Sequence, residues 1–284
     1  MRILEQSQAV VLFDLSNVVA RATAVAQHNF MGLLCRMLLK QRKRYPSHEF
    51  VFAVEGAGTL ARQRVLPAYK DGRVPSPEFQ DARNAAIKML HYVACTLIKA
   101  PEGEADDAIA TYTEHHPDAD IIVVSNDRDL WQLISPNVRI QAKVGKDTID
   151  VDRFACVRHL GVLPEAVPLM KALCGDSSDC IPRGVPRVHE KKLKQLAQAA
   201  ADQEDRLDLI VDNADWLTDP DKKKIHAAAS VVKQHLQVTR AWNNLQLVQR
   251  KYAGDVDGLL GFLEYHNADG LSREDVETIV GEAT

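Results

Sequence analysis

The chain has 284 residues, of which 46% are hydrophobic and 26% are charged, with a formal net charge of −4. This length accommodates one sizeable α/β domain and a smaller second region, and the composition is that of a water-soluble globular protein. We expect no membrane span, because no stretch approaches the roughly 18 to 20 apolar residues that one needs, and no secretory signal at residues 1–5. A cytoplasmic location is predicted.

The cysteines argue against a disulfide framework and against a zinc site. There are five, an odd number, and they are scattered without Cys-x-x-Cys spacing. We expect them to be reduced thiols, mostly buried. They are Cys35, Cys95, Cys156, Cys174 and Cys180.

Charge is distributed unevenly along the chain. Residues 1–73 contain 11 Lys and Arg against 5 Asp and Glu, whereas residues 101–152 contain 4 against 12. A basic surface suits a polyanion such as DNA, and a dense acidic block suits bound metal ions. Two solvated faces of opposite sign would give the same counts, so charge alone leaves both interpretations open.

Short apolar runs alternate with helical patterns in the first half of the chain. The runs predict strands buried in a parallel sheet, at residues 8–14 (QAVVLFD), 49–55 (EFVFAVE) and 120–125 (DIIVVS). Apolar residues spaced three and four apart predict helices at about 24–40, 77–93 and 104–115. Strands alternating with helices form a doubly wound α/β sheet.

Acidic residues stand at the ends of these predicted strands. Asp14 and Glu55 end the first two runs, and Asp127 and Asp129 follow the third in SNDRDL. Ligands of such sheets gather at the carboxyl ends of the strands, so these side chains are candidates for one site. Asp127 has a plainer alternative, because an aspartate at that position also caps a following helix.

Two further acidic groups have structural alternatives of the same kind. Glu104, Asp106 and Asp107 open a predicted helix in PEGEADD, where the helix dipole favours acids. Asp176 and Asp179 lie in the Ser-rich turn CGDSSDCIP, a common place for aspartate. Taken together, the acidic groups predict a cation-binding site. Carboxylates gathered at one sheet edge repel each other unless cations bind between them.

The predicted metal is Mg²⁺ or Mn²⁺. Neither histidine nor cysteine is among the candidate ligands, and oxygen-only ligands favour such hard ions, held partly through water. Two ions about 4 Å apart commonly assist displacement at phosphorus, one activating water and the other stabilising the leaving oxygen.

From about residue 155 the strand pattern fades and helical patterns continue to Thr284. We therefore divide the chain into an α/β domain at 1–154 and a helical region at 155–284.

Six segments in order resemble the 5′-nuclease family, which comprises flap endonucleases and the 5′→3′ exonuclease domain of bacterial DNA polymerase I. They span about residues 10–196, and GEADD and GDSSD-x-IP are the most specific. The segments are VLFDLSNVVARA, AVEG, PAYKDGR, GEADDAIA, SNDRDLWQL and LCGDSSDCIPRGVP.

This resemblance implies a fold, an activity and partners. The fold is a PIN-like, mainly parallel sheet flanked by helices, with a C-terminal helical region containing a helix-two-turn-helix at about 164–200. The activity is 5′→3′ exonuclease and flap endonuclease cleavage of DNA, and of RNA in RNA–DNA hybrids, in primer removal or DNA degradation. The expected protein is a stand-alone monomer of a bacterial or phage-infected cell that acts on a 5′ end, flap or nick.

The resemblance also implies two or more divalent ions held by acidic residues. Glu55 departs from the pattern, because that position is usually Asp, and the longer side chain would shift a ligand outward or act through water. The positions that match are Asp14, Glu104, Asp106, Asp107, Asp127, Asp129, Asp176 and Asp179.

Basic residues supply the expected DNA track and the catalytic cations. Arg21 matches an arginine that faces the cleaved strand, and Arg62, Lys70 and Arg73 match basic positions in LARQRVLPAYKDGR. Lys70 and Arg73 stand at the base of a helical gateway for the 5′ strand, where a cation stabilises charge that develops at phosphorus. Tyr69 suits either stacking on a base or packing in the core.

The expected helix-two-turn-helix departs from its family at the hairpin. The sequence GVPRVHEKK places Arg187 and His189 where the family has two glycines, which brings both the close DNA approach and a bound monovalent cation into question. Residues 183–194 nevertheless contain five Lys and Arg and one acid. Lys191 and Lys192 are the expected phosphate contacts.

Three other functions compete with this interpretation. A haloacid-dehalogenase-type phosphotransferase would use Asp14 as nucleophile, but it needs an acid two residues on, where Ser16 stands. A PIN-type ribonuclease shares the sheet and about four acids, but not the Asp176 and Asp179 pair with the basic turn. A catalytically weak junction-binding protein would have lost key acids, and here only Glu55 deviates.

Overall fold

The structure is a computed structural model that describes residues 8–26, 28–144, 147–201 and 203–281. The chain forms two compact units. The first unit comprises Met1–Gly56, Val74–Asn126 and Asn243–Thr284, and the second comprises Ala57–Arg73 and Asp127–Trp242. The chain therefore passes twice from the first unit to the second and back.

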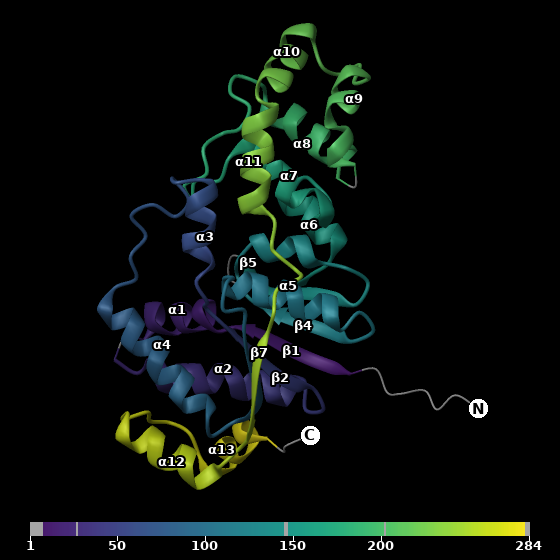
Figure 1. The fold of residues 1–284 in the computed structure, drawn as a ribbon. Helices are drawn as coiled ribbons and strands as arrows, with labels where there is room; N and C mark the ends of the chain where they lie inside the picture. Colours follow the sequence, from purple (N-terminus) through teal and green to yellow (C-terminus); the bar gives the residue numbers. More distant parts are fainter. Residues whose placement is uncertain (1–7, 27, 145–146, 202, 282–284) are drawn as a thin grey trace, which may run out of the picture. The chain divides into compact units, whose positions relative to one another are not determined.

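A mostly parallel sheet forms the centre of the first unit, with its strands in the order β4, β1, β2, β3, β7 (Figure 1). β1 pairs in parallel with β2 and with β4, and β2 pairs in parallel with β3. β7 runs antiparallel to β3. The strands are β1 (Ala9–Asp14), β2 (Glu49–Val54), β3 (Ala94–Lys99), β4 (Asp120–Val124) and β7 (Val248–Ala253).

Helices cover both faces of this sheet. Alternate residues of β1 point to opposite faces: Val11 and Phe13 join a core with α1, α2, α4, α12 and α13, and the other face meets α5. The yellow helices α12 and α13 lie together, and α13 packs against α2 (Figure 1). The helices are α1 (Leu15–Val25), α2 (Phe30–Arg44), α4 (Pro77–Leu90), α5 (Ala105–His115), α12 (Val256–Tyr265) and α13 (Arg273–Val280).

Aromatic packing holds the central strands of the first unit in register. The rings of Phe13 and Phe52 stack with their centroids 4.5 Å apart, and Phe50 contacts both. All three side chains are buried. Because these rings come from β1 and β2, their packing fixes where the carboxyl ends of the two strands lie, and Asp14 ends β1.

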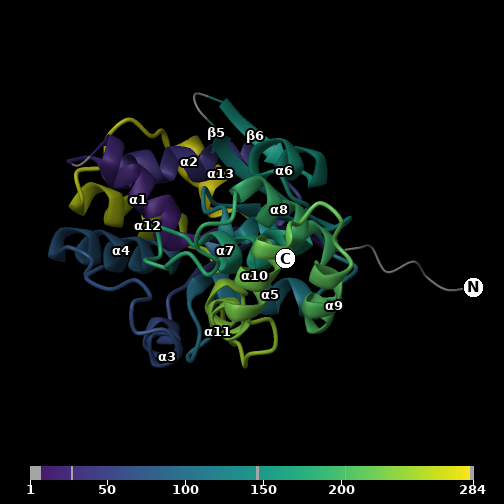
Figure 2. The same ribbon diagram turned by 90° about the horizontal axis from the view of Figure 1, so that it is seen from above.

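The second unit is mainly helical. Helix α7 packs against α8 and α11, and α11 also contacts α3 and α10 (Figure 2). The same unit contains β5 and β6, which pair antiparallel with each other. The elements of the second unit are α3 (Gly58–Val65), η1 (Asp129–Leu133), β5 (Val138–Val144), β6 (Asp147–Val151), α6 (Arg153–Leu160), η2 (Pro164–Ala166), α7 (Val167–Cys174), α8 (Glu190–Ala199), η3 (Glu204–Arg206), α9 (Leu207–Asp212), α10 (Asp219–Ala227) and α11 (Ala229–Thr239).

A tight loop follows α7 and presents two of the predicted acids. Asp176 and Ile181 form an antiparallel bridge, with N–O distances of 2.9 and 2.7 Å. Gly175 precedes the loop with φ +81°, and a Cβ there would lie 2.8 Å from the backbone nitrogen of Arg183. Glycine is therefore required at this position.

The predicted elements and the observed ones agree in part. The α/β class, the three predicted strands and the helices near 77–93 and 104–115 are confirmed. The helix predicted at 24–40 is wrong in its bounds: α1 ends at Val25 and α2 begins at Phe30. Helices dominate after about 155, and one strand that the sequence did not indicate, β7, lies among them.

The division expected near residue 154 differs from the two compact units. Residues 243–284 belong with the first unit, and residues 127–154 belong with the second. Residues 164–200, where a helix-two-turn-helix is expected, include η2, α7 and α8 of the second unit.

Within the described residues, no helix is both long enough and apolar enough to cross a membrane. The five cysteines are free thiols, and Cys35, Cys95 and Cys156 are buried, as predicted.

Candidate active site

Asp14 is fixed at the carboxyl edge of the first unit's sheet. It is the last residue of β1 and the N-cap of α1, and its Oδ1 accepts a hydrogen bond of 3.0 Å from the backbone nitrogen of Asn17. Its Oδ2 accepts another of 3.0 Å from the hydroxyl of Ser125, which follows β4. With 5% of its surface exposed, the carboxylate is held from two sides.

A second group of acids surrounds the N-terminus of α5 in the same unit. Glu55 follows β2, and its Oε2 accepts a hydrogen bond of 3.0 Å from the backbone nitrogen of Ala105. Glu104 and Asp107 form a capping box, in which Asp107 Oδ2 accepts from the Glu104 nitrogen at 2.8 Å. Asp106 is half-buried in the first turn.

The helix-capping alternative therefore describes part of this group. A carboxylate has about four acceptor positions, so one capping bond leaves the group able to bind a cation as well. Asp14 pairs with Ala53 across β1 and β2, and Glu55 follows two residues later. The structure thus brings Asp14 and Glu55 to neighbouring strand ends, and Glu104 and Asp107 to the helix that Glu55 contacts.

The remaining acids gather in the second unit. Asp127 Oδ1 accepts a hydrogen bond of 2.9 Å from the backbone nitrogen of Asp129, the first residue of η1. Asp176 Oδ1 accepts from the backbone nitrogen of Ser178 at 2.8 Å. Asp179, only 7% exposed, lies in the same loop as Asp176. We call Asp127, Asp129, Asp176 and Asp179 the second-unit acid cluster.

Burial and neighbouring charges act in opposite directions on these carboxyls. Burial raises the pKa of Asp127 and of Asp179 despite the attraction of nearby cations. Burial also acts to raise the pKa of Asp176, but the Lys171 charge and hydrogen bonds from Lys171 and Ser178 outweigh it, so the pKa is lowered. Burial therefore outweighs the nearby cations at Asp127 and Asp179, and the cation and hydrogen bonds outweigh burial at Asp176.

Lys171 is a residue that the sequence analysis missed. It is 8% exposed on α7, and its ammonium forms ion pairs with Asp129 and with Asp176 Oδ2. The signal was available, because Lys171 is the lone charged residue in the apolar helix VPLMKALC and precedes Asp176 by five positions. A buried lysine is costly unless it is paired, which points to an acidic partner.

Lys70 and Arg73 lie beside the second-unit acid cluster. The backbone nitrogen of Lys70 donates to the carbonyl oxygen of Asp179 at 2.9 Å, and Lys70 has φ 50°. Arg73 Nη1 lies 3.2 Å from Asp179 Oδ1, and 63% of its side chain is exposed. Both charges act on Asp127 as well. Both cations are therefore close to acids, and the guanidinium of Arg73 is accessible to a phosphate.

Arg62 and Tyr69 serve the packing of the second unit. Arg62 is 2% exposed, donates from Nε to the carbonyl of Val238 at 3.2 Å, and lies over the Trp242 ring. This placement leaves little of its guanidinium for the DNA contact expected of it. Tyr69 is 2% exposed and packs with Ile181 and Val238, so the core alternative describes it. In the first unit, Arg21 is half-buried on α1, and burial lowers its pKa.

The basic turn before α8 keeps a glycine-like backbone without glycine. Arg187 has φ 60°, whereas His189 has φ −63° and caps α8. The carbonyl oxygen of Arg187 accepts a hydrogen bond of 3.0 Å from Lys224 Nζ. Lys191 is exposed, and Lys192 pairs with Asp221 at 2.6 Å. In this chain, the turn carbonyl of Arg187 therefore accepts a hydrogen bond from the Lys224 ammonium.

The donor chemistry of both acid groups fits divalent ions. Across the residues that the structure describes, no three His, Cys, Asp or Glu side chains converge as a ready-made metal site. In the second unit, the ammonium of Lys171 lies between the carboxylates of Asp129 and Asp176. Buried carboxylates that offer oxygen donors alone suit Mg²⁺ or Mn²⁺. The carboxylates of the second unit also already pair with a cation, Lys171. The residues therefore fit such ions.

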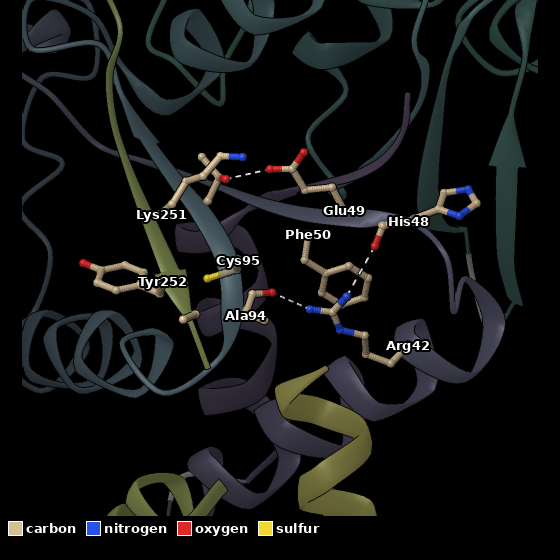
Figure 3. A pocket seen from close by; sticks show the side chains of 10 residues that line it. Arg42, His48, Glu49, Phe50, Ala94, Cys95, Lys251 and Tyr252 are labelled. Atoms are coloured by element: carbon tan, nitrogen blue, oxygen red, sulfur yellow. Dashed lines mark hydrogen bonds between the residues drawn. The ribbon is translucent and has the colours of Figure 1, made fainter. Parts of the chain in front are cut away.

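A separate cavity of about 220 Å³ lies at the other end of β2 and β3 (Figure 3). Arg42 crosses it, donating to the carbonyl oxygens of His48 at 3.3 Å and Ala94 at 2.6 Å, with its guanidinium over the Phe50 ring. Burial lowers the pKa of Arg42 to about 10. Arg42 thus joins α2 to the amino ends of two strands, away from Asp14.

The sequence matches a known family and known relatives. The family described as 5′-3′ exonuclease, N-terminal resolvase-like domain, matches residues 8–160. A flap endonuclease Xni of Yersinia pseudotuberculosis is 31% identical over 224 residues, which cover 76% of this chain and 85% of that protein. The chain belongs to the 5′-3′ exonuclease family.

Another member of the 5′-3′ exonuclease family matches a shorter part of the chain. A 5′-3′ exonuclease of Buchnera aphidicola subsp. Baizongia pistaciae is 30% identical over 171 residues, 58% of this chain and 54% of that protein. The match therefore spans about half the length of that relative.

Solved structures support the same fold. The T5 D15 protein, co-crystallised with metal ions, has a TM-score of 0.68 and 17% identity, with 96% of this chain and 99% of that chain covered. Human GEN1 in complex with Holliday junction DNA has a TM-score of 0.64 and 17% identity, with 96% and 71% covered. At these identities the likeness shows the fold.

Proposed function

We propose that this member of the 5′-3′ exonuclease family is a structure-specific 5′ nuclease that hydrolyses phosphodiester bonds of DNA near a free 5′ end, flap or nick. RNA in RNA–DNA hybrids is an additional proposed substrate, and primer removal or DNA degradation is the proposed role. The relatives named flap endonuclease and 5′-3′ exonuclease support this, as does the T5 neighbour. Because the relatives are bacterial, we place the activity in the cytoplasm of a bacterial or phage-infected cell.

One observation carries the proposal most directly. Lys70 and Arg73 lie beside buried carboxylates of the second-unit acid cluster, with Arg73 Nη1 3.2 Å from Asp179 Oδ1 and Lys70 joined to Asp179 through its backbone. Carboxylates for metal ions together with accessible cations for a phosphate are the two parts that phosphoryl transfer requires.

We assign the metal ligands by unit. In the first unit, Asp14, Glu55, Glu104, Asp106 and Asp107 are the proposed ligands, and the second-unit acid cluster supplies the others. Mg²⁺ or Mn²⁺ is the proposed ion, and bound ions supply an activated water and charge stabilisation at phosphorus. One T5 5′-exonuclease neighbour carries divalent zinc ions, which supports a divalent site in this fold.

The chain's own side chains have separate tasks around the substrate. Ser125 and the backbone of Asn17 hold the Asp14 carboxylate in one orientation. The exposed guanidinium of Arg73 and the ammonium of Lys70 are proposed to contact the phosphate that is cut, where they stabilise negative charge without a proton transfer. Arg21, Lys191 and Lys192 are proposed DNA-backbone contacts, and Arg62 is proposed to support them from within the packing.

A substrate panel tests the proposal. Labelled 5′-flap, nicked duplex, RNA–DNA hybrid and single-stranded RNA are compared with Mg²⁺, Mn²⁺ or chelator, using Asp14→Asn as the control for contaminating nuclease. We expect cleavage of the flap near its 5′ junction by the unaltered protein alone. Cleavage restricted to single-stranded RNA would favour a PIN-type ribonuclease, and tight flap binding without cleavage would favour a junction-binding protein.

A further inference from the structure

The position of Lys171 carries a consequence for metal binding by the second-unit acid cluster. Its ammonium forms ion pairs with Asp129, at the start of η1, and with Asp176, in the loop after α7. Lys171 therefore contacts two segments that are far apart in the sequence. Its side chain is 9% exposed, so solvent does little to screen these interactions.

The charge of Lys171 also acts on the other two carboxylates of the cluster. Lys171 acts electrostatically on Asp127 and on Asp179 as well as on its two direct partners. Asp127 in turn accepts a hydrogen bond from the backbone of Asp129. One buried ammonium is thus the common counter-charge of four carboxylates that come from two loops.

An ammonium and a divalent ion repel each other when both contact the same carboxylates. A metal ion such as Mn²⁺ or Mg²⁺ binds carboxylate oxygen at about 2.0 to 2.2 Å, and an ammonium donates from about 2.7 to 2.9 Å. A metal between Asp129 and Asp176 would therefore lie within a few ångströms of Lys171 Nζ, where two positive charges repel strongly. We therefore expect an ion that binds both residues to displace the lysine.

We propose that Lys171 is an internal counter-cation that competes with a divalent metal ion for Asp129 and Asp176 and thereby sets the metal affinity of the second-unit acid cluster. The inference rests on the proposed function, because it takes the cluster to be a metal site. Lys171 acts as a positioning residue: it keeps the four carboxylates together in the metal-free protein and lowers their affinity for metal. Its removal should strengthen metal binding.

If Lys171 promoted metal binding, its removal would lower the metal affinity and not raise it, so the proposal can be tested. If Lys171 instead prepared the two aspartates as ligands and stayed in place with metal bound, its removal would weaken metal binding. A lysine that merely holds α7 in the fold would change stability and leave metal affinity unaltered.

The experiment measures Mn²⁺ binding to the complete protein without DNA, by calorimetry and by the electron paramagnetic resonance signal of free Mn²⁺. We compare the unaltered protein with Lys171→Met, which keeps side-chain length in an apolar helix, and with Lys171→Arg, which keeps the charge. Lys194→Met is the matched control, because Lys194 pairs with Glu190 on α8, away from the cluster. We expect one ion to bind at least ~10-fold more tightly to Lys171→Met, with the other two proteins unchanged.

A double variant assigns the ion to this cluster. The gain in affinity should disappear in Lys171→Met/Asp176→Asn, because the tighter ion uses the Asp176 carboxylate. A gain that survives this change would place the ion elsewhere and overturn the proposal. Equal or weaker Mn²⁺ binding by Lys171→Met would also overturn it, while leaving the proposed nuclease function in place.

A measurement on the unaltered protein covers the case in which Lys171→Met does not fold. Acetic anhydride modifies accessible lysine, and peptide mass spectrometry reports the extent at Lys171. Mn²⁺ should raise acetylation of Lys171 several-fold and leave that of Lys194 unchanged; no rise at Lys171 would contradict the proposal. Failure of the unaltered protein to bind any Mn²⁺, with Lys171 unaffected, would instead remove the metal site itself and the proposed function with it.

Discussion

Ser125 donates a hydrogen bond of 3.0 Å from its hydroxyl to Oδ2 of Asp14, and both residues are buried. The contact joins the carboxyl ends of β4 and β1, which are neighbours in the sheet. It also leaves Asp14 with a defined orientation, because its other oxygen accepts from the backbone of Asn17. A serine directly after a strand thus sets the geometry of a proposed metal ligand.

Replacing this serine should affect both stability and catalysis. Ser125→Ala removes a donor from a buried carboxylate, and such a loss lowers the free energy of unfolding by about 1 to 3 kcal/mol. We expect a matching fall in the single-turnover rate of flap cleavage. Thr278→Ala is the control, because its hydroxyl donates a solvent-exposed hydrogen bond to the Glu274 carbonyl on α13. Urea unfolding curves that coincide for Ser125→Ala and the unaltered protein would contradict the predicted loss of stability, and equal single-turnover rates would contradict the catalytic role.

Loss of the Asp14 charge should separate chemistry from binding. Asp14→Asn should lower the single-turnover rate by at least ~100-fold, because one oxygen ligand and its charge are removed from a site that stabilises the transition state. The affinity for the same flap should stay the same or rise, since a negative charge near phosphate has gone. Both constants are measured at one salt concentration. Cleavage at the unaltered rate would show that Asp14 is no metal ligand.

Lys70 should contribute mainly to the transition state. We expect Lys70→Ala to reduce the single-turnover rate of bound flap by about 100-fold and the affinity far less, because charge develops on the phosphate during the reaction. Lys233→Ala, on the exposed face of α11, is the control for a general loss of positive charge. If the change at Lys70 appears entirely in the dissociation constant, Lys70 holds DNA and does not assist cleavage.

Much of the fold could be predicted because buried parallel strands have a clear pattern. β1, β2 and β4 are continuous apolar runs, and each was placed within a residue or two. Helix α1 was missed because Asp14 is at once the last residue of β1 and the N-cap of α1, so no turn marks the boundary. Strand β7, VQRKYA, is mostly polar and exposed, and it becomes a strand through pairing with β3.

The candidate acids could be predicted from their place after strands and from family resemblance, but their contacts could not. The sequence favours a DNA contact for Arg62, whereas burial against Trp242 depends on residues far along the chain. Lys171 shows the converse. A charged residue in an apolar helix marks a buried partner, and the partner Asp129 lies 42 positions away in another element.

The two ion pairs of His226 in the second unit predict that the stability of the fold depends on pH. His226 on α10 contacts Asp212 at 2.8 Å and Asp208 at 3.0 Å, and these hydrogen bonds raise its pKa. A histidine with a raised folded-state pKa stabilises the fold fully below about pH 6.5, its unfolded value, and this stabilisation is lost as pH rises through the folded-state pKa. His226→Gln should therefore lower the urea midpoint at pH 6 more than at pH 9.

The control for this measurement is His28→Gln, because His28 is exposed. Its urea midpoint should follow that of the unaltered protein at both pH values. A His226→Gln difference that is equal at pH 6 and pH 9 would mean that the charge of His226 does not stabilise α9 and α10.

The most direct test of the nuclease assignment is the metal dependence of flap cleavage. A 5′-labelled flap is mixed with excess enzyme in chelator, and Mg²⁺ or Mn²⁺ is then added in stoichiometric excess. We predict no cleavage before addition and rapid release of the flap after it, with Asp14→Asn inactive throughout, because buried oxygen ligands serve this chemistry through bound divalent ions. Full cleavage in excess chelator would contradict the account.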